Sequence, residues 1–264
     1  MRTKKRKAKK IKKEINRIKM ALCLIVEAIV ILTLVVIIGW NKGVGDWMES
    51  LQRPVVRKLE MSGINSPYAV LMQVKGGKII GNMKGDEKIY PASMTKIMTY
   101  IVTAETVSDL QNTRTTVPES VAEELEGTGS SLAEIQTGES FTIYELLNLM
   151  MVPSGNDAAL TLAKYVDSLN ITADDPQYDE DGDGKMSCVE LMNKKAAELG
   201  CTNTHFVNPH GLHDENHYTT AREMATITEY ALTMPYFTDV TSQTYYTQPP
   251  TNMTSEERTV TTTN

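Results

Sequence analysis

The chain has 264 residues, a hydrophobic content of 41% and a formal net charge of −6, which together describe an ordinary globular protein. This average hides two unlike parts. Residues 41–264 hold 16 Lys/Arg and 31 Asp/Glu, a balance of −15. Such an acidic surface excludes a nucleic-acid partner for this part of the chain.

The first forty residues have the composition of a membrane anchor. Residues 1–19 contain eleven Lys/Arg and one acidic residue, and they should stay solvated as a basic tail. Residues 20–40 are almost continuously apolar and would span about 31 Å as a helix, roughly one hydrocarbon core. We therefore predict a single-pass, uncleaved signal-anchor in the cell membrane, with the N-terminus cytoplasmic and the rest extracellular.

A soluble alternative for this region is a buried helix behind a nucleic-acid-binding tail, and the lack of a second, polar face speaks against it. Glu27 is the one acidic residue inside the apolar span. The sequence leaves open whether its carboxyl group is protonated, reaches the headgroups or pairs with another helix.

Beyond the span, a stalk over residues 41–62 is followed by a single α+β domain over residues 63–264. A β-hairpin is predicted at 67–82, where two β-rich runs flank a Lys-Gly-Gly-Lys turn. The predicted helices cover 93–106, 141–151, 156–168, 188–199 and 220–233. The end, residues 241–264, is rich in Thr and turn formers, stops without a capping element and looks unfinished.

Cysteine usage gives no disulfide framework. Cys23 falls in the apolar span, and Cys188 and Cys201 flank a predicted helix of roughly 18 Å, beyond the limit of about 7 Å between bridged Cα atoms. We predict that Cys188 and Cys201 stay unlinked.

Ser93 lies three residues before Lys96 at the start of an apolar helix. An i, i+3 pair shares one side of a helix, and burial would lower the pKa of the lysine enough for it to act as a neutral base toward the hydroxyl. Serine is also an ordinary helix N-cap, so the pair alone supports either a nucleophile or a cap.

A second polar group, Ser154-Gly155-Asn156, lies in a turn between two apolar helices. A second hydroxyl can relay a proton, and an Asn amide can hold a substrate amide. The alternative is a simple turn in which Asn156 or Asp157 caps the following helix.

Together these motifs resemble a known family. Ser-x-x-Lys followed by Ser-x-Asn is the order of penicillin-binding proteins and serine β-lactamases. The stretches YPASMTKIMT, GSSLAEIQTGESFTIYELLNLMMVPSGNDAA, NTHFVNPHGL and NHYTTAREMA resemble, more narrowly, the D-alanyl-D-alanine carboxypeptidases, low-molecular-mass penicillin-binding proteins. The resemblance runs from about residue 66 to the end, with an acidic insertion at about 171–190.

The resemblance implies a transpeptidase-like domain of helices packed on an antiparallel sheet. It implies a cell-surface serine hydrolase that removes the terminal D-alanine from peptidoglycan stem pentapeptides in cell-wall remodelling, is inhibited by β-lactams and needs no cofactor. In these roles Ser93 is the acylated nucleophile, Lys96 its base and Ser154 the proton shuttle. Asn156 binds the substrate backbone, and the Ser93 N–H is one oxyanion-hole donor.

The family's third motif, Lys-Thr-Gly on a sheet strand, is absent from the 264 residues. We expect a chain truncated before that motif, with its C-terminal strands missing. The missing strand would bind the substrate carboxylate and supply the second oxyanion donor, so we expect weak or no activity. The alternative is a catalytically inert, surface-anchored protein that binds peptidoglycan or a partner. The sequence does not separate carboxypeptidase from endopeptidase activity. It shows no convincing equivalent of a deacylating glutamate, which speaks against a β-lactamase.

Within the acidic insertion, residues 179–190 match the pattern of a calcium-binding loop. Three alternating aspartates and a main-chain carbonyl would turn toward the ion, and a glutamate from the next helix would close the sphere. The predicted ligands are Asp179, Asp181, Asp183, Glu190 and Lys185 through its carbonyl. The alternatives are a structural calcium ion of weak affinity and a solvated acidic loop without metal.

All four histidines lie within residues 205–217, which taken alone would suggest zinc. No His-Glu-x-x-His helix accompanies them. The resemblance implies a structural loop here instead, so zinc is not expected.

Overall fold

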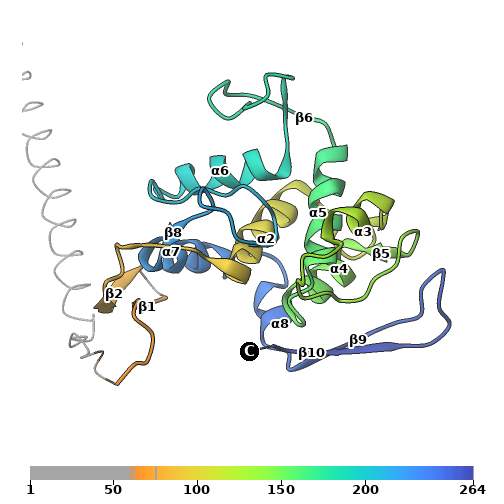
Figure 1. The fold of residues 1–264 in the computed structure, drawn as a ribbon, viewed down its shortest axis with the longest axis horizontal. Helices are drawn as coiled ribbons and strands as arrows, with labels where there is room; N and C mark the ends of the chain where they lie inside the picture. The colour runs from red at the N-terminus through yellow and green to blue at the C-terminus, as the bar shows by residue number, and fades with distance from the viewer. Residues whose placement is uncertain (1–60, 62, 75, 264) are drawn as a thin grey trace, which may run out of the picture. The chain divides into compact units, whose positions relative to one another are not determined.

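The computed structural model describes residues 61, 63–74 and 76–263 (Figure 1). The chain divides into two compact units, Met1–Arg57 and Lys58–Asn264, and every described residue belongs to the second. The predicted basic tail and apolar span, and all of the stalk except residue 61, lie outside the described residues. Within the described residues, no helix is long and apolar enough to cross a membrane.

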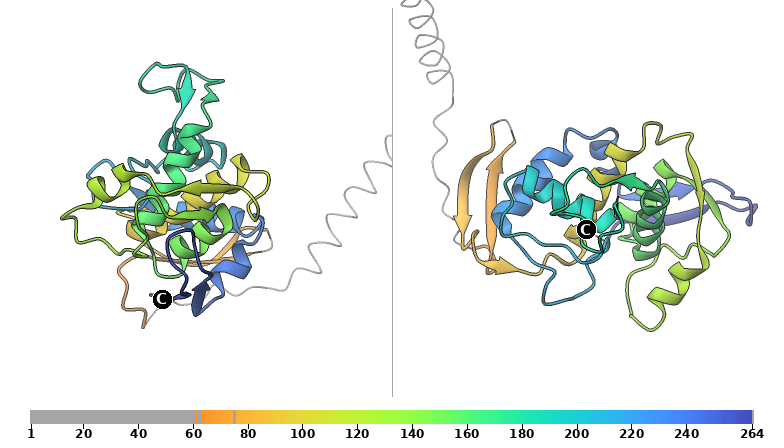
Figure 2. Two further views of the ribbon diagram at one scale, coloured as in Figure 1. Left: turned by 90° about the vertical axis from the view of Figure 1, so that its right-hand side faces the viewer. Right: turned by 90° about the horizontal axis from the view of Figure 1, so that it is seen from above.

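The predicted hairpin is confirmed. Strand β1 (Ala69–Gln73) pairs antiparallel with β2 (Lys78–Met83) around the Gly-Gly turn, and β1 packs against helix α7 (Ala221–Ala231) (Figures 1 and 2). Among the described residues β1 has no second strand partner. A cavity of about 860 Å³, mostly apolar, is lined by residues of β1 and α7.

The five predicted helices are also present. A short 3-10 turn (Ala92–Met94) leads into α2 (Thr95–Thr106). The others are α4 (Ile143–Met151), α5 (Asn156–Ser168), α6 (Cys188–Glu198) and α7. Helices α4 and α6 begin at capping boxes, Thr142 with Glu145 and Ser187 with Glu190, in which each side chain accepts a backbone N–H of the other residue.

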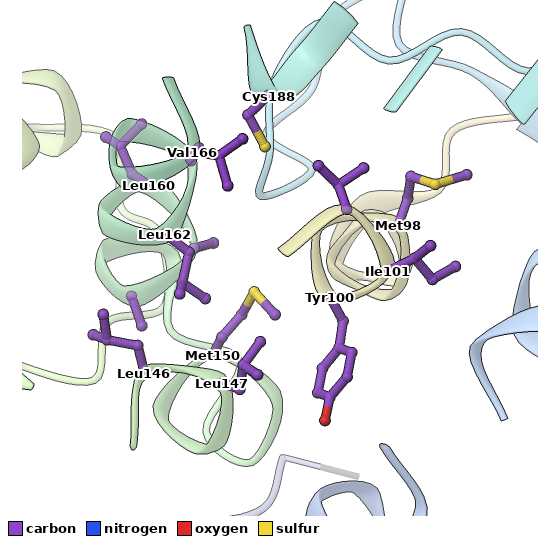
Figure 3. Packing of buried hydrophobic residues seen from close by; sticks show 14 of the residues in the cluster. Met98, Tyr100, Ile101, Leu146, Leu147, Met150, Leu160, Leu162, Val166 and Cys188 are labelled. Carbon is purple, nitrogen blue, oxygen red and sulfur yellow. The ribbon is translucent and has the colours of Figure 1, made fainter. Parts of the chain in front are cut away.

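Helix α2 forms the centre of the domain. Its buried side chains belong to one hydrophobic cluster with those of α4 and α5. In Figure 3, Leu162 of α5 and Met150 of α4 point toward α2, while Met98 and Ile101 lie on the other side of α2. Leu147, Leu162 and most of this cluster are fully buried, so it forms one continuous core. Because α2 is covered on several sides, the polar residues of its first turn are buried with it.

Several short elements were not predicted. They are α3 (Glu119–Leu125), α8 (Phe237–Thr241) and the strand pairs β3 (Lys88–Ile89) with β8 (Thr219–Thr220), β4 (Arg114–Thr116) with β5 (Ser140–Thr142), and β6 (Ile171–Thr172) with β7 (Lys185–Met186). The described residues thus hold separate two-stranded antiparallel pairs rather than one larger sheet. The β6–β7 pair carries the acidic insertion, which projects from the domain (Figures 1 and 2).

The Thr-rich end forms a further hairpin, β9 (Tyr245–Gln248) with β10 (Arg258–Thr261). Arg258 pairs at 3.1 Å with Glu139, whose side chain is 1% exposed, and Thr251 also donates to that carboxylate. These contacts fasten the hairpin to the domain, and sequence reasoning did not predict this hairpin. Cys188 and Cys201 are both buried and unlinked, as predicted.

Candidate active site

The site begins at the junction between the 3-10 turn and α2. The Lys96 Nζ atom donates to the Ser93 Oγ atom at 3.1 Å. The N-cap of the 3-10 turn is Pro91 and that of α2 is Met94, so Ser93 caps neither. Ser93 is exposed while Lys96 is 1% exposed, which places an accessible hydroxyl over a buried amine.

Lys96 is held by two further acceptors. Its Nζ atom donates to the Ser154 Oγ atom at 3.3 Å and to the carbonyl oxygen of His210 at 3.0 Å. Burial lowers the pKa of Lys96 from its ordinary value to about 8, against the opposing effect of the Asp157 carboxylate, which raises it. About a tenth of this amine is therefore neutral at pH 7, far more than for an ordinary lysine, and the neutral form can accept a proton.

Ser154 reaches Lys96 from a tight turn between α4 and α5. Its φ of +62° is in the left-handed region, which is rare for a residue with a side chain and is typical of functional sites. Gly155 follows without room for a side chain, since a Cβ atom there would lie 2.6 Å from the Leu149 carbonyl oxygen. The surrounding contacts therefore fix the conformation of this turn, and the turn holds the Ser154 hydroxyl in place.

Asn156 and Asp157 open α5 directly after this turn. Asn156 is 4% exposed, and among the described residues its side-chain amide has no hydrogen-bond partner. Neither residue is the N-cap, which is Gly155. Instead, Asp157 accepts backbone N–H groups of Ala133, Ile135 and Ala158 at 2.9 to 3.1 Å, and so ties the segment before α4 to the site.

Sequence reasoning missed two parts of this site. Burial raises the pKa of Asp157 while its backbone hydrogen bonds lower it. The charge of Asp157 acts on Lys96, yet the sequence suggested for Asp157 only the role of a helix cap. The His210 carbonyl carries no residue-type signal, because every residue has a carbonyl group. The only sequence signal for His210 is its position in the Asn-Pro-His-Gly stretch.

The histidine-containing loop, residues 205–217, is fastened to α2. The Thr99 hydroxyl donates to the Pro209 carbonyl at 2.6 Å, and Thr95 Oγ1 lies 2.7 Å from His217 Nε2. The Val207 N–H donates to His217 Nδ1, so Nε2 carries the proton and donates to Thr95. These bonds present the His210 carbonyl to Lys96.

Burial lowers the pKa values of His210 and His217 to about 4, so both rings are neutral at physiological pH. Among the described residues the histidines form no group close enough to share a metal ion. Gly211 closes the loop at φ +91°, where a Cβ atom would lie 1.9 Å from the Ala92 carbonyl oxygen. The loop is therefore pressed against the backbone that carries the nucleophile.

The acidic loop lies apart from these residues, on the projecting β6–β7 segment. Ligand atoms of Asp179, Asp181 and Asp183 lie within 4.8 Å of one another. The Glu190 carboxylate accepts the Ser187 and Glu180 N–H groups instead, at 2.6 and 2.7 Å. Lys185 lies in β7 opposite Thr172. The three aspartates are thus brought together, while Glu190 is engaged at the start of α6.

Comparison with known proteins places these motifs in one family. The sequence profile of the family Peptidase S11, D-alanyl-D-alanine carboxypeptidase, matches residues 55–263. The curated carboxypeptidase DacF of Bacillus subtilis is 35% identical over 157 residues, which cover 60% of this chain and 36% of the relative. DacC of Escherichia coli is 31% identical, with 63% and 39% covered. The chain thus spans about two fifths of the length of these relatives.

Solved structures agree on the fold. The DD-transpeptidase of Streptomyces K15 superposes with a TM-score of 0.65 at 26% identity, covering 78% of this chain and 76% of the other. Penicillin-binding protein 6B of Escherichia coli gives a TM-score of 0.64 at 24% identity, covering 78% and 60%. The described domain therefore has the fold of the penicillin-binding DD-peptidases.

The buried carboxylate of Asp157 gives a stability prediction. Asp157→Asn should lower the free energy of unfolding by about 1–3 kcal/mol, because an amide keeps one acceptor oxygen for three backbone donors. Urea unfolding measures the loss. Exposed Glu257→Gln, with no hydrogen-bond partner in the described residues, is the control and should stay within about 0.5 kcal/mol of the parent. Equal stability of the two variants would contradict the prediction.

Proposed function

Because this chain belongs to the D-alanyl-D-alanine carboxypeptidase family, we propose that it is a serine-type D-Ala-D-Ala carboxypeptidase acting on peptidoglycan stem peptides. The observation that carries the proposal is the hydrogen bond between the buried Lys96 amine and the exposed Ser93 hydroxyl. A neutral amine beside an accessible hydroxyl is an activated nucleophile.

In the acylation step, Lys96 takes the Ser93 hydroxyl proton while Oγ bonds to the carbonyl carbon of the penultimate D-alanine. The oxyanion that forms accepts the Ser93 backbone N–H, in a role carried over from the family. The bond to the terminal D-alanine breaks as Ser154 donates its proton to the leaving nitrogen and takes one from the Lys96 ammonium. A water molecule then hydrolyses the ester by the same transfers in reverse.

Asn156 would bind the peptide backbone of the substrate. The Asn156 residue is largely buried, but its amide atoms, which have no hydrogen-bond partner among the described residues, stay accessible and are free for a ligand. β-Lactams would acylate Ser93 through the same attack. The inert, partner-binding alternative gives no account of the three acceptors that converge on Lys96.

The membrane placement is part of the proposal. Residues 20–40 would cross the membrane once, residues 1–19 would stay in the cytoplasm and residues 41–62 would form a stalk. Residues 63–264 would then face the cell wall, where the substrate is. The basic flank and the length of the apolar run support this arrangement.

Calcium on the acidic loop is a second proposal, with a structural role. Asp179 Oδ1 is buried without a hydrogen-bond partner in the described residues, beside the carboxylates of Asp181 and Asp183. Gly184 adopts φ +78°, which allows the tight turn of such a loop. Carboxylate oxygens at this spacing fit calcium, and we expect an affinity on the order of 10⁻⁴ to 10⁻³ M.

Labelling with a fluorescent β-lactam tests the nucleophile. The full chain should be labelled slowly but covalently. Ser93→Ala should abolish labelling because the attacking oxygen is gone, and Ser154→Ala should only slow it. Thr106→Ala, at the far end of α2, is the control and should label like the parent. Unchanged labelling of Ser93→Ala, or none of the parent, would refute the proposal.

The pH dependence of labelling tests the base. Only the neutral amine accepts the proton, so the rate should rise about tenfold per pH unit below pH 8 and level off above it. Asp157→Asn removes a charge that raises the pKa of Lys96, so its midpoint should move to lower pH. A flat profile between pH 6 and 9 would show that Lys96 is not the base.

Calorimetric titration of the full chain with calcium chloride tests the acidic loop. Heat of binding should appear at millimolar calcium and fall sharply in Asp181→Asn, because one carboxylate ligand becomes neutral. Asp109→Asn, an exposed change outside the loop, is the control and should bind like the parent. A flat trace for the parent at millimolar calcium would end the proposal.

A further inference from the structure

The Lys96 amine has three hydrogen-bond partners, as many as its nitrogen has positions for. Two of them, the hydroxyls of Ser93 and Ser154 at 3.1 and 3.3 Å, can each donate or accept a hydrogen. The third, the carbonyl oxygen of His210 at 3.0 Å, can only accept. Because a carbonyl group carries no hydrogen, the amine keeps an N–H bond turned toward His210 whether it is charged or neutral.

This constraint limits where the lone pair of the neutral amine can point. A neutral amine has two N–H bonds and one lone pair, and the carbonyl takes one of the N–H bonds. When the second N–H bond donates to Ser154, the lone pair faces the Ser93 hydroxyl and can accept its proton. After the transfer, all three N–H bonds of the ammonium group face an acceptor, so no heavy atom has to move. Such preorganisation lowers the cost of the proton transfer.

The loop that carries the His210 carbonyl is joined to α2 by one buried imidazole ring. His217 is 2% exposed, and both of its ring nitrogens are used. Nδ1 accepts the Val207 N–H at 3.1 Å, and Nε2 donates to Thr95 Oγ1 at 2.7 Å. Thr95 is fully buried and directly precedes Lys96. The ring therefore connects the start of the loop, its end and the helical turn that carries the base.

A second bond fastens the same loop one turn further along α2. The Thr99 hydroxyl donates at 2.6 Å to the carbonyl oxygen of Pro209, the residue before His210. Two successive carbonyl groups of the loop thus accept from α2, the first from Thr99 and the second from Lys96. The Thr99 bond holds the loop on the helix, while the His217 bond acts at the residue next to the base.

We propose that His217 is a positioning residue of the active site, which holds the His210 carbonyl against Lys96 and so directs the lone pair of the amine to the Ser93 hydroxyl. The proposal rests on the proposed function for the reaction that the lone pair serves. His217 acts through Thr95 and the loop, and its ring takes no proton in the acylation step.

The test measures labelling of the full chain by a fluorescent β-lactam at about pH 9.5, where Lys96 is largely neutral, over a range of label concentrations. Thr95→Val keeps the shape of the side chain but removes the acceptor of the His217 N–H. The maximal rate should fall about three- to tenfold, as for the loss of one hydrogen bond, while the half-saturating concentration stays the same. His217→Ala should lower the maximal rate as well, because it removes both bonds of the ring.

Two matched variants separate positioning from stability. Thr95→Ser restores the acceptor and should bring the rate back to that of the parent. Thr103→Val makes the same change at a fully buried threonine of α2 whose hydroxyl donates within the helix, to the Thr99 carbonyl at 2.8 Å, and it should label like the parent. Circular dichroism checks that the variants fold. An undiminished rate in Thr95→Val, or an equal fall in Thr103→Val, would overturn the proposal.

A carbon-13 NMR titration of Lys96 gives a readout that does not depend on acylation. The His210 carbonyl accepts from the charged amine and stabilises it, so displacing that carbonyl in Thr95→Val should lower the titration midpoint of Lys96. Thr103→Val should keep the midpoint of the parent. An unchanged or raised midpoint in Thr95→Val would contradict the positioning role. A lowered midpoint without any labelling of the parent would instead count against the proposed function alone.

Discussion

The structure depends on burying one amine. Lys96 is 1% exposed, and its Nζ atom meets two hydroxyls and a main-chain carbonyl. Taking a lysine out of water disfavours its charged form, and this is why its pKa falls to about 8. The three acceptors offset part of that cost, so the amine is retained in the core instead of turning outward.

Three segments that are distant in sequence have to meet for the Lys96 amine to be buried in this way. The 3-10 turn brings Ser93, the turn before α5 brings Ser154, and the loop fastened through Thr95 and Thr99 brings the His210 carbonyl. Ala92 and Ser154 both have positive φ, at +49° and +62°. Residues with side chains adopt this conformation at a cost of order 1–3 kcal/mol, which the surrounding contacts must supply. The strain lies beside the two hydroxyls that face Lys96.

Much of this was predictable from the sequence. Apolar periodicity indicated the five longer helices, and the Gly-Gly turn indicated the first hairpin. The spacing of Ser93 and Lys96 predicted their contact, because i, i+3 residues share a helix face. The acidic repeat likewise predicted that three aspartates would gather, although Glu190 joins a capping box instead.

The rest depends on tertiary structure. Strand pairs of two or three residues are too short to show a period, and α3 has only seven residues. The β9–β10 hairpin is held by Arg258 with a buried glutamate over a hundred positions away, which no local pattern reveals. Asp157 looked like a cap because its backbone donors come from a separate segment.

The most direct measurement is the titration of Lys96 itself. A carbon-13 NMR titration of the lysine side chains, with Lys96 assigned from Lys96→Arg, follows the protonation of this one amine. The account predicts a midpoint near pH 8, well below the ordinary lysine value of 10.5. A midpoint at or above 10 would mean that the amine is solvated and charged, and the proposed base would be lost.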